Sequence, residues 1–199
     1  MWDQRYDQTE FVYGTNPNDF LKDSYLYIPK GGKVLCLAEG EGRNAVFIAM
    51  QGYQVTAVDQ SKVGLEKAKK LAEENGVEIE TIVSDLEHFD LGKECWDGIV
   101  SIFAHVPPAL REKLHTQVQG ALKKGGVLIL EGFTPRQPEM SGTGGPPPSQ
   151  KELFMSLDSL KEELSNLEFK IAHETERELS EGKHHEGLCS VVQIVGLKV

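Results

Sequence analysis

A glycine turn between an apolar run and a helical segment places the strongest constraint on the fold of this chain. The stretch from Gly32 to Ala45 reads as a strand, a tight turn and the start of a helix. Gly40 and Gly42 lie in the turn, and a second strand ends at Asp59. Glycines let the backbone approach a ligand, and a carboxylate at this strand end is placed to accept hydrogen bonds from ribose hydroxyls. This order predicts the front of a nucleotide-binding βαβ unit.

The rest of the chain alternates between strand and helix patterns. Hydrophobic periodicity predicts strands at 33–38, 54–58, 78–83, 96–103, 127–130, 169–179 and 188–199, and helices at 18–25, 44–51, 63–74, 107–122 and 157–164. Ser61 is the expected N-cap of the 63–74 helix. Alternation of this kind predicts an α/β fold, a doubly wound and mostly parallel seven-stranded sheet. The last two strands have only a polar turn at 180–183 between them, which predicts a C-terminal antiparallel hairpin.

Length, composition and charge limit the class of protein. The 199 residues predict a single domain, 1–199, with an N-terminal arm or lid at 1–28 and an α/β core at 32–199. A net charge of −10 argues against general binding of nucleic acid or of anionic membranes. The chain lacks a long apolar run and an apolar N-terminal segment, and its three cysteines lack metal-ligand spacing. We therefore expect a cytoplasmic protein with no membrane partner and no metal.

The charges beside the glycine turn separate two classes of cofactor. Residues 40–45 fit G-x-G-x-x-A, a pattern in which the turn and the helix start hold the pyrophosphate of a dinucleotide. Glu39 and Glu41 would repel a pyrophosphate, at a cost on the order of 1 kcal/mol or more for each contact. S-adenosyl-L-methionine carries a sulfonium and an ammonium instead, and the backbone N–H groups at the helix start can receive its carboxylate. This cofactor is favoured, with an NAD(P)-binding oxidoreductase as the alternative.

Further motifs occur along nearly the whole chain. They are the arm at 2–6, the glycine loop at 40–45, the second strand at 55–61, the turn at 84–86 and the fifth strand at 125–133. Together they resemble the class I S-adenosylmethionine-dependent methyltransferases, in particular small bacterial and cyanobacterial proteins near the tellurite-resistance methyltransferases, and more distantly the thiopurine methyltransferases. The resemblance implies a Rossmann-like fold and methyltransferase activity. Cys36 and Ala38 depart from it, because the family loop reads Asp-Leu-Gly-Cys-Gly where this chain has 36–40.

The resemblance also implies which residues bind the cofactor. Asp59 would bind the ribose hydroxyls, and Asp85 would bind the adenine amino group. Because the loop lacks the family's aspartate and glycine at 36 and 38, Glu39 would face the ammonium of the cofactor instead. The full set of expected cofactor-binding residues is Ala38, Glu39, Gly40, Gly42, Asn44, Asp59, Gln60, Ser84, Asp85, Leu86 and Ile102. Four aromatic residues of the arm are expected to cover the cofactor: Trp2, Tyr6, Phe11 and Tyr13.

The residues that would act on the methyl acceptor are less constrained by the sequence. His105 follows the fourth strand and is the candidate general base, with orientation of a loop as the alternative role. The candidate substrate-binding residues are Tyr13, Arg43, Arg177 and His185. Arg43 would bind a carboxylate or anchor the arm. Arg177 and His185 would bind an anionic substrate or only pair with neighbouring glutamates.

The expected reaction follows from what the sequence lacks. No evident base motif is present, and Asn/Asp-Pro-Pro-Tyr, the motif of amino-group methylation, is replaced by residues 104–107. A soft nucleophile that is already anionic, such as a thiolate or a chalcogen oxyanion, needs alignment but no base. We therefore expect methylation of a small molecule of this kind. A non-catalytic module that binds an adenosyl cofactor is the remaining alternative, and the oligomeric state is not predicted.

Overall fold

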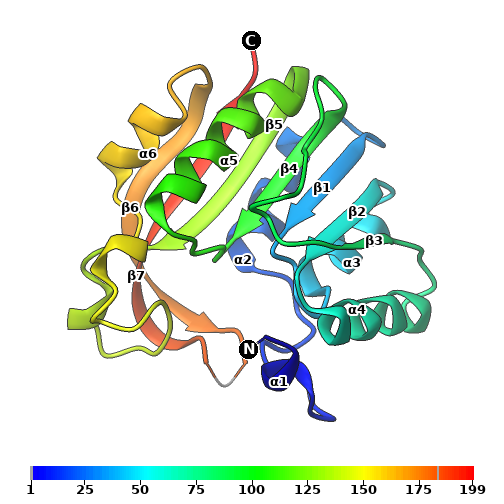
Figure 1. Cartoon of the computed structure of the whole chain (residues 1–199), viewed down its shortest axis with the longest axis horizontal. Helices are drawn as coiled ribbons and strands as arrows, with labels where there is room; N and C mark the ends of the chain where they lie inside the picture. Colours follow the sequence, from blue (N-terminus) through cyan, green and yellow to red (C-terminus); the bar gives the residue numbers. More distant parts are fainter. Residues whose placement is uncertain (1, 183) are drawn as a thin grey trace.

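A seven-stranded sheet in the order β3-β2-β1-β4-β5-β7-β6 forms the centre of the molecule. The structure is a computed structural model that describes residues 2–182 and 184–199. Strands β1 to β5 are parallel, and β7 runs antiparallel to both β5 and β6. Helices cover both faces of the sheet, and the N-terminal helix α1 lies at one end of it (Figure 1). The predicted doubly wound sheet with a C-terminal antiparallel hairpin is confirmed.

The predicted elements are present, most with small shifts at their ends. The strands are β1 Lys33–Leu37, β2 Gln54–Asp59, β3 Glu80–Val83, β4 Trp96–Ile102, β5 Leu122–Phe133, β6 Glu168–Ser180 and β7 Glu186–Leu197. The α-helices are α1 Trp2–Tyr6, α2 Asp19–Ser24, α3 Arg43–Met50, α4 Lys62–Glu74, α5 Pro108–Ala121 and α6 Leu157–Glu163. Strand β5 is the main difference. It begins at Leu122, pairs there with Trp96, and passes through the predicted glycine turn as an irregularity before pairing again at Val127.

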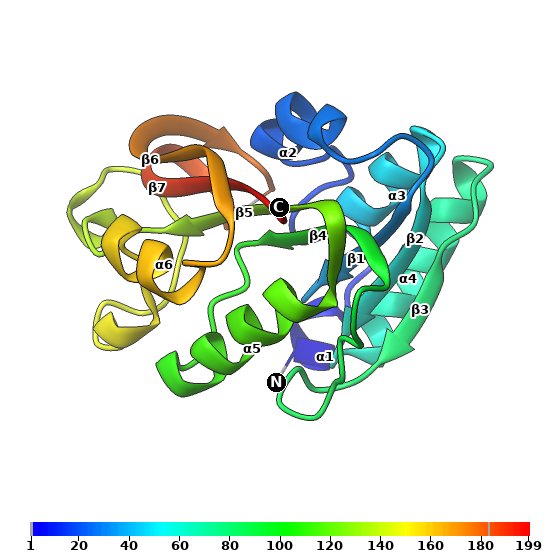
Figure 2. The same ribbon diagram turned by 90° about the horizontal axis from the view of Figure 1, so that it is seen from above.

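Alternate residues of the central strands supply two hydrophobic layers. Leu35 and Leu37 of β1 pack on the face covered by α5 and α6. Val34 and Cys36 of the same strand pack on the other face, under α2, α3 and α4. Figure 2 shows α2 and α3 on one side of the sheet and α5 and α6 on the other. Burial on both faces explains why these parallel strands read as continuous apolar runs.

The predicted N-terminal arm has two structural parts. Phe20 and Leu21 of α2 and the following Ile28 are buried in the second hydrophobic layer, so this part belongs to the core. The segment before them lies along α4. There Asp3 accepts a hydrogen bond from the Ser61 hydroxyl at 2.5 Å. The ammonium of Lys67 donates to three backbone carbonyls of the arm, at residues 6, 8 and 10.

Each helix among residues 2–182 and 184–199 is too short or too polar to cross a lipid bilayer. Ser61 caps α4 as predicted, since its hydroxyl accepts a hydrogen bond from the backbone N–H of Gly64 at 3.0 Å. The predicted turn at 180–183 joins β6 and β7, and one of its residues, Lys183, lies outside the described residues.

Candidate functional site

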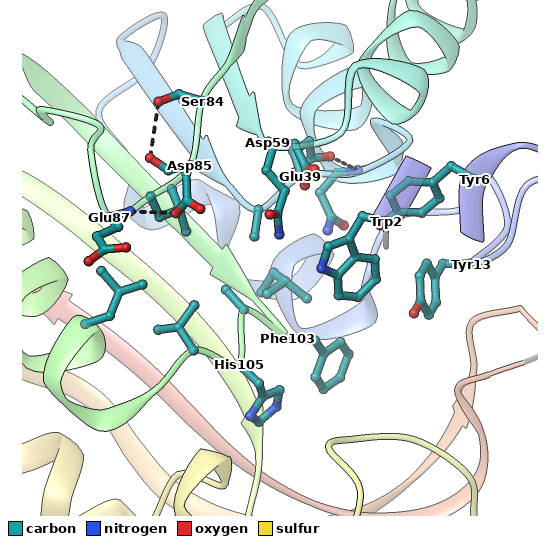
Figure 3. A pocket seen from close by; sticks show the side chains of 18 of the residues that line it. Trp2, Tyr6, Tyr13, Glu39, Asp59, Ser84, Asp85, Glu87, Phe103 and His105 are labelled. Atoms are coloured by element: carbon teal, nitrogen blue, oxygen red, sulfur yellow. Dashed lines mark hydrogen bonds between the residues drawn. The ribbon is translucent and has the colours of Figure 1, made fainter. Parts of the chain in front are cut away.

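A cavity of about 400 Å³ opens at the carboxyl ends of the parallel strands, within the size range of small-molecule sites. It lies where the chain order reverses between β1 and β4, which is the usual ligand position in open α/β sheets. Figure 3 shows four carboxylates along one side of the cavity and Phe103 and His105 on the other. The described residues that line it are Trp2, Tyr6, Tyr13, Ala38, Glu39, Arg43, Asn44, Asp59, Gln60, Ser84, Asp85, Leu86, Glu87, Ile102, Phe103, Ala104, His105, Val106, Pro107, Leu110 and His185.

Glu39, in the loop after β1, binds the start of helix α3. Its Oε1 atom accepts hydrogen bonds from the backbone N–H groups of Asn44 at 3.0 Å and Ala45 at 2.8 Å. Burial raises the pKa of Glu39 to about 7, against the opposing effect of these hydrogen bonds and of Arg43. Two amides at the helix start are therefore used by the protein itself. A ligand carboxylate would have to use other N–H groups near the helix start.

Gly40 and Gly42 serve close contacts within the protein. Both have positive φ, of 62° and 90°. A Cβ atom at Gly40 would lie 2.5 Å from the Tyr6 hydroxyl, and one at Gly42 would lie 2.5 Å from the Cβ atom of Ala68. Neither glycine is among the described residues that line the cavity. Their lack of a side chain thus allows the arm and α4 to pack on the loop, and their role in binding a cofactor stays a prediction.

Asp59, at the end of β2, is buried and hydrogen-bonded through both oxygens. Oδ2 accepts from the backbone N–H of Gly40 at 2.9 Å, and Oδ1 accepts from that of Ser61 at 2.7 Å. Burial raises the pKa of Asp59, while these two hydrogen bonds oppose the rise. The carboxylate therefore ties the glycine loop to the start of α4 and faces the cavity at the same time.

The turn after β3 carries a second carboxylate to the cavity. Asp85 Oδ1 accepts the backbone N–H of Glu87 at 2.9 Å, which closes a tight local turn. Leu86, beside it, is buried and supplies an apolar surface. Gln60, Ser84 and the other predicted residues Ala38, Asn44 and Ile102 also line the cavity. The structure thus brings together nine of the eleven predicted cofactor-binding residues, all except the two glycines.

His105 is held through both ring nitrogens. Nδ1 lies 2.8 Å from the carbonyl oxygen of Leu153, and Nε2 accepts the backbone N–H of Phe133 at 3.1 Å. Burial lowers the pKa of His105 to about 4. The neutral ring donates from Nδ1 and accepts at Nε2, so neither nitrogen retains a lone pair for an incoming proton. In this arrangement His105 orients the ends of two segments, which was the alternative role given to it from the sequence.

Of the predicted substrate-binding residues, Tyr13, Arg43 and His185 line the cavity. Arg177 is placed behind them instead. It donates two hydrogen bonds, at 2.8 and 2.7 Å, to the fully buried carboxylate of Glu131. Its guanidinium pairs with the buried carboxylates of Glu131 and Glu181, and pairing with glutamates is the alternative role given to it from the sequence.

A buried polar network connects these residues, and sequence reasoning missed it. Glu131 also accepts hydrogen bonds from Asn18 at 2.6 Å and Gln193 at 2.8 Å. Glu181 accepts from Arg43 at 2.6 Å, Asn18 at 2.9 Å and Arg177 at 3.0 Å. The charged Glu131 directly after the apolar run 127–130 is the sequence signal that could have found it. A charge in such a strand needs a buried partner.

Three aromatic residues of the arm, Trp2, Tyr6 and Tyr13, line the cavity, as the prediction of a cover requires. The fourth, Phe11, packs elsewhere. Its ring lies 4.9 Å from the Lys67 ammonium, and it contacts the small hydrophobic cluster between α3 and α4.

Comparison with known proteins agrees with this geometry. Residues 34–126 match the family model described as a methyltransferase domain. The chain is 33% identical over 116 residues to the uncharacterized methyltransferase YbaJ of Bacillus subtilis, and the match covers 58% of this chain and 45% of that protein. The chain therefore spans less than half the length of this curated relative. Residues 34–126 include the glycine loop, Asp59 and the turn at 84–86.

A little less than half of the chain is therefore similar to a methyltransferase domain.

Solved structures share the fold of this chain over nearly its whole length. TehB from Haemophilus influenzae superposes with a TM-score of 0.72 at 19% identity, covering 100% of this chain and 66% of that one. A 1,6-didemethyltoxoflavin N1-methyltransferase from Burkholderia thailandensis, solved with S-adenosylhomocysteine, gives a TM-score of 0.67 at 16% identity and covers 92% of this chain and 78% of that one. The comparisons do not favour an oxidoreductase or a non-catalytic module.

The residues that line the cavity fit an adenosyl cofactor better than a dinucleotide. Four carboxylates line the cavity, from Glu39, Asp59, Asp85 and Glu87. A pyrophosphate would meet these negative charges, and the α3 amides that could receive it are bound to Glu39. A sulfonium and an ammonium are favoured by the same charges.

Proposed function

We propose that this protein transfers a methyl group from S-adenosyl-L-methionine to a small molecule. The observation that carries the proposal is a cavity at the β1/β4 switch point with carboxylates on one side and an aromatic wall on the other. The first side suits a cationic adenosyl cofactor, and the second leaves space for an acceptor. A domain with the methyltransferase fold and this cavity has both parts that methyl transfer requires.

Each end of the cofactor has a partner in the cavity wall. Asp59 would accept hydrogen bonds from the ribose hydroxyls through its remaining lone pairs. Asp85 and Leu86 would hold the adenine, one by its amino group and the other by apolar contact. Glu39 would lie near the ammonium while it keeps the start of α3 in place. When bound, S-adenosyl-L-methionine supplies an electrophilic methyl group.

The acceptor is proposed to be a soft nucleophile that is already anionic at the site, such as a thiolate or a chalcogen oxyanion. Support comes from His105, whose two ring nitrogens are engaged by Leu153 and Phe133. Without a free base at that position, the protein contributes alignment and exclusion of water.

The segment at 2–13 is proposed to act as a cover over the bound cofactor, with the α/β core beneath it. Trp2, Tyr6 and Tyr13 present their rings to the cavity, and Asp3 and Lys67 hold the segment against α4. A cover of this kind excludes water and commits the substrate to reaction.

Two measurements test the proposal. Isothermal titration should show binding of S-adenosylmethionine and S-adenosylhomocysteine, and no comparable binding of NAD(H). A labelled-methyl assay across thiols, selenite, tellurite, amines and carboxylates should then give product with the thiols or chalcogen oxyanions. Tight NAD(H) binding without a response to either adenosyl ligand would overturn the cofactor assignment. Methylation of amines alone would overturn the acceptor class.

A further inference from the structure

Glu41, the second acidic residue of the glycine loop, forms a buried ion pair that the function proposed above does not use. Only 4% of its surface is exposed, and it is not among the described residues that line the cavity. Its carboxylate pairs with the ammonium of Lys67 on α4 and accepts the backbone N–H of Val12 at 2.8 Å. Both contacts connect the glycine loop to the N-terminal arm at 2–13.

The arm wraps around the Lys67 ammonium. This group donates hydrogen bonds to the backbone carbonyls of residues 6, 8 and 10, at 3.4, 3.1 and 2.7 Å. The ring of Phe11 lies 4.9 Å from the same nitrogen. Only 16% of the lysine side chain is exposed, although lysines are mostly exposed in folded proteins. One ammonium therefore binds the arm along much of its length.

The first part of the arm buries little of its own surface. Among residues 2–10, Tyr6 alone is buried, and all the others except Trp2 are exposed. Asp3 adds one contact, because it accepts the hydrogen bond from the Ser61 hydroxyl at 2.5 Å. Segments with few buried apolar contacts open at a low cost in free energy. The polar contacts to α4 and to the glycine loop therefore determine how firmly this segment is docked.

The docked arm forms one wall of the cavity. The rings of Trp2 and Tyr6 are stacked with their centroids 5.8 Å apart, and both line the cavity together with Asp59 (Figure 3). The Tyr6 hydroxyl lies so close to Gly40 that a side chain there would collide with it. Release of the arm would remove both rings from this wall. A ligand in the cavity should therefore exchange faster when the arm is released.

We propose that the ion pair of Glu41 and Lys67 is a latch that holds the arm closed and that opens before an adenosyl cofactor enters or leaves. The inference rests on the proposed function and deepens it, because it assigns control of cofactor exchange to this pair. Neither residue is among the described residues of the cavity lining, so both are positioning residues that act through the rings of the arm. The pair joins the arm to the loop after β1 and to α4 at once.

Quenching of Trp2 fluorescence by acrylamide measures release of the arm without any ligand. Trp96→Phe is introduced into every protein compared, so that Trp2 is the one remaining tryptophan. Lys67→Met removes the donors to the arm and leaves the Glu41 carboxylate buried without a cation, which disfavours the docked state. Quenching of Trp2 should therefore rise. Lys70→Met is the matched control, because Lys70 lies on the same helix with 74% of its side chain exposed, and it should leave quenching unchanged.

Stopped-flow release of S-adenosylhomocysteine tests the latch in the complex. Lys67→Met should speed dissociation about 10- to 100-fold, the range for loss of a charge-assisted hydrogen bond, and Lys70→Met should not change it. Adding Glu41→Gln to Lys67→Met removes the unpaired charge and keeps an oxygen for the Val12 N–H. The double variant should therefore release the ligand more slowly than Lys67→Met alone. Loss of lysine packing without a latch would not give this partial rescue.

The outcomes separate this inference from the proposed function. If S-adenosylhomocysteine does not bind, the proposed function fails, and control of cofactor exchange fails with it. If it binds and folded Lys67→Met shows wild-type quenching or wild-type release, the latch is wrong and the proposed function stands. Glu41→Gln alone is the milder variant if Lys67→Met does not fold. It should raise both quenching and the release rate, and no change in either would overturn the latch.

Discussion

Replacing Asp59 by asparagine gives a direct test of how the ribose is held. The asparagine keeps one oxygen and turns the other into an amide NH₂ group, which must face either Gly40 N–H or Ser61 N–H. Both of these groups donate to Asp59 now, at 2.9 and 2.7 Å. Losing one such bond to a charged acceptor costs about 1.5–3 kcal/mol of folding stability. The variant should therefore fold with a lower melting temperature.

The effect on the cofactor is separate and similar in size. If Asp59 accepts hydrogen bonds from the ribose hydroxyls, loss of its charge should weaken binding of S-adenosylhomocysteine by about 1–3 kcal/mol, or roughly 5- to 150-fold. Isothermal titration with S-adenosylhomocysteine and its 2′,3′-dideoxy analogue measures this directly. The wild-type protein should prefer the hydroxylated ligand, and Asp59→Asn should lose most of that preference.

Ser61→Ala is the matched control for a general loss of stability. It removes the α4 cap, at a cost of about 1 kcal/mol, and keeps the backbone N–H that binds Asp59. Ser61 is not among the described residues of the cavity lining. The Ser61→Ala variant also loses the hydrogen bond to Asp3 that holds the arm, which affects both ligands alike, so its preference for the hydroxylated ligand over the dideoxy analogue should stay at the wild-type level. If folded Asp59→Asn still discriminates fully between the two ligands, the ribose is held by other residues and the reasoning is refuted.

Three other changes test the cover, His105 and Glu39. Deleting residues 1–13 should leave the sheet folded, because Phe20 and later residues supply the core. The deletion should also speed release of S-adenosylhomocysteine in stopped-flow measurements. Global unfolding of the shortened chain would show instead that Tyr6 is needed for the core. His105→Gln should leave the cofactor Kd unchanged and lower kcat less than about tenfold, whereas a loss of roughly 10²–10⁴-fold would identify it as the base. Burial raises the pKa of Glu39 from 4.5 to about 7 in the folded protein, so its contribution to stability falls as the pH rises through this range. Urea unfolding should show that the free energy of unfolding falls less between pH 5 and pH 8 in Glu39→Gln than in the wild-type protein. An equal fall in the two proteins would contradict the raised pKa of Glu39.

Local signals account for what the sequence predicts well. Ser61 caps α4 through a hydrogen bond only three residues away, to Gly64, so the neighbouring letters contain the whole interaction. The parallel strands are recognised by their apolar runs because both faces are buried. The sequence predicts that Asp59 and Asp85 lie at the cavity, because Asp59 ends strand β2 and Asp85 closely follows strand β3. Parallel strands bring their carboxyl ends to one edge of the sheet.

The parts that the sequence does not predict depend on distant pairings. Asn18 binds Glu131 and Glu181, which lie 113 and 163 positions away. Those contacts exist only once β5, β6 and β7 pair in their particular register, and a slip of one residue in β5 would turn the Glu131 carboxylate to the other face of the sheet. His105 is similar, because its fixed role depends on the Leu153 carbonyl 48 positions later. From the sequence alone, a histidine after a strand is a candidate base, because the carbonyl that binds it cannot be located.

The altered loop of 36–40 shows how two departures from a family pattern can be accommodated together. Cys36 is fully buried in the layer under α3, where burial raises the pKa of its thiol, so no charge is left on the strand at that position. The carboxylate near the turn comes from Glu39 instead, and its hydrogen bonds to α3 fix the loop from the helix side. Ala38 then adopts φ of 50°, a left-handed conformation that costs an L-residue about 1–2 kcal/mol relative to its usual regions. The backbone N–H of Glu39, bonded to the Val58 carbonyl at 3.1 Å, helps to hold Ala38 there. The loop thus keeps its turn without the glycine because its neighbours fix the conformation that glycine would adopt freely.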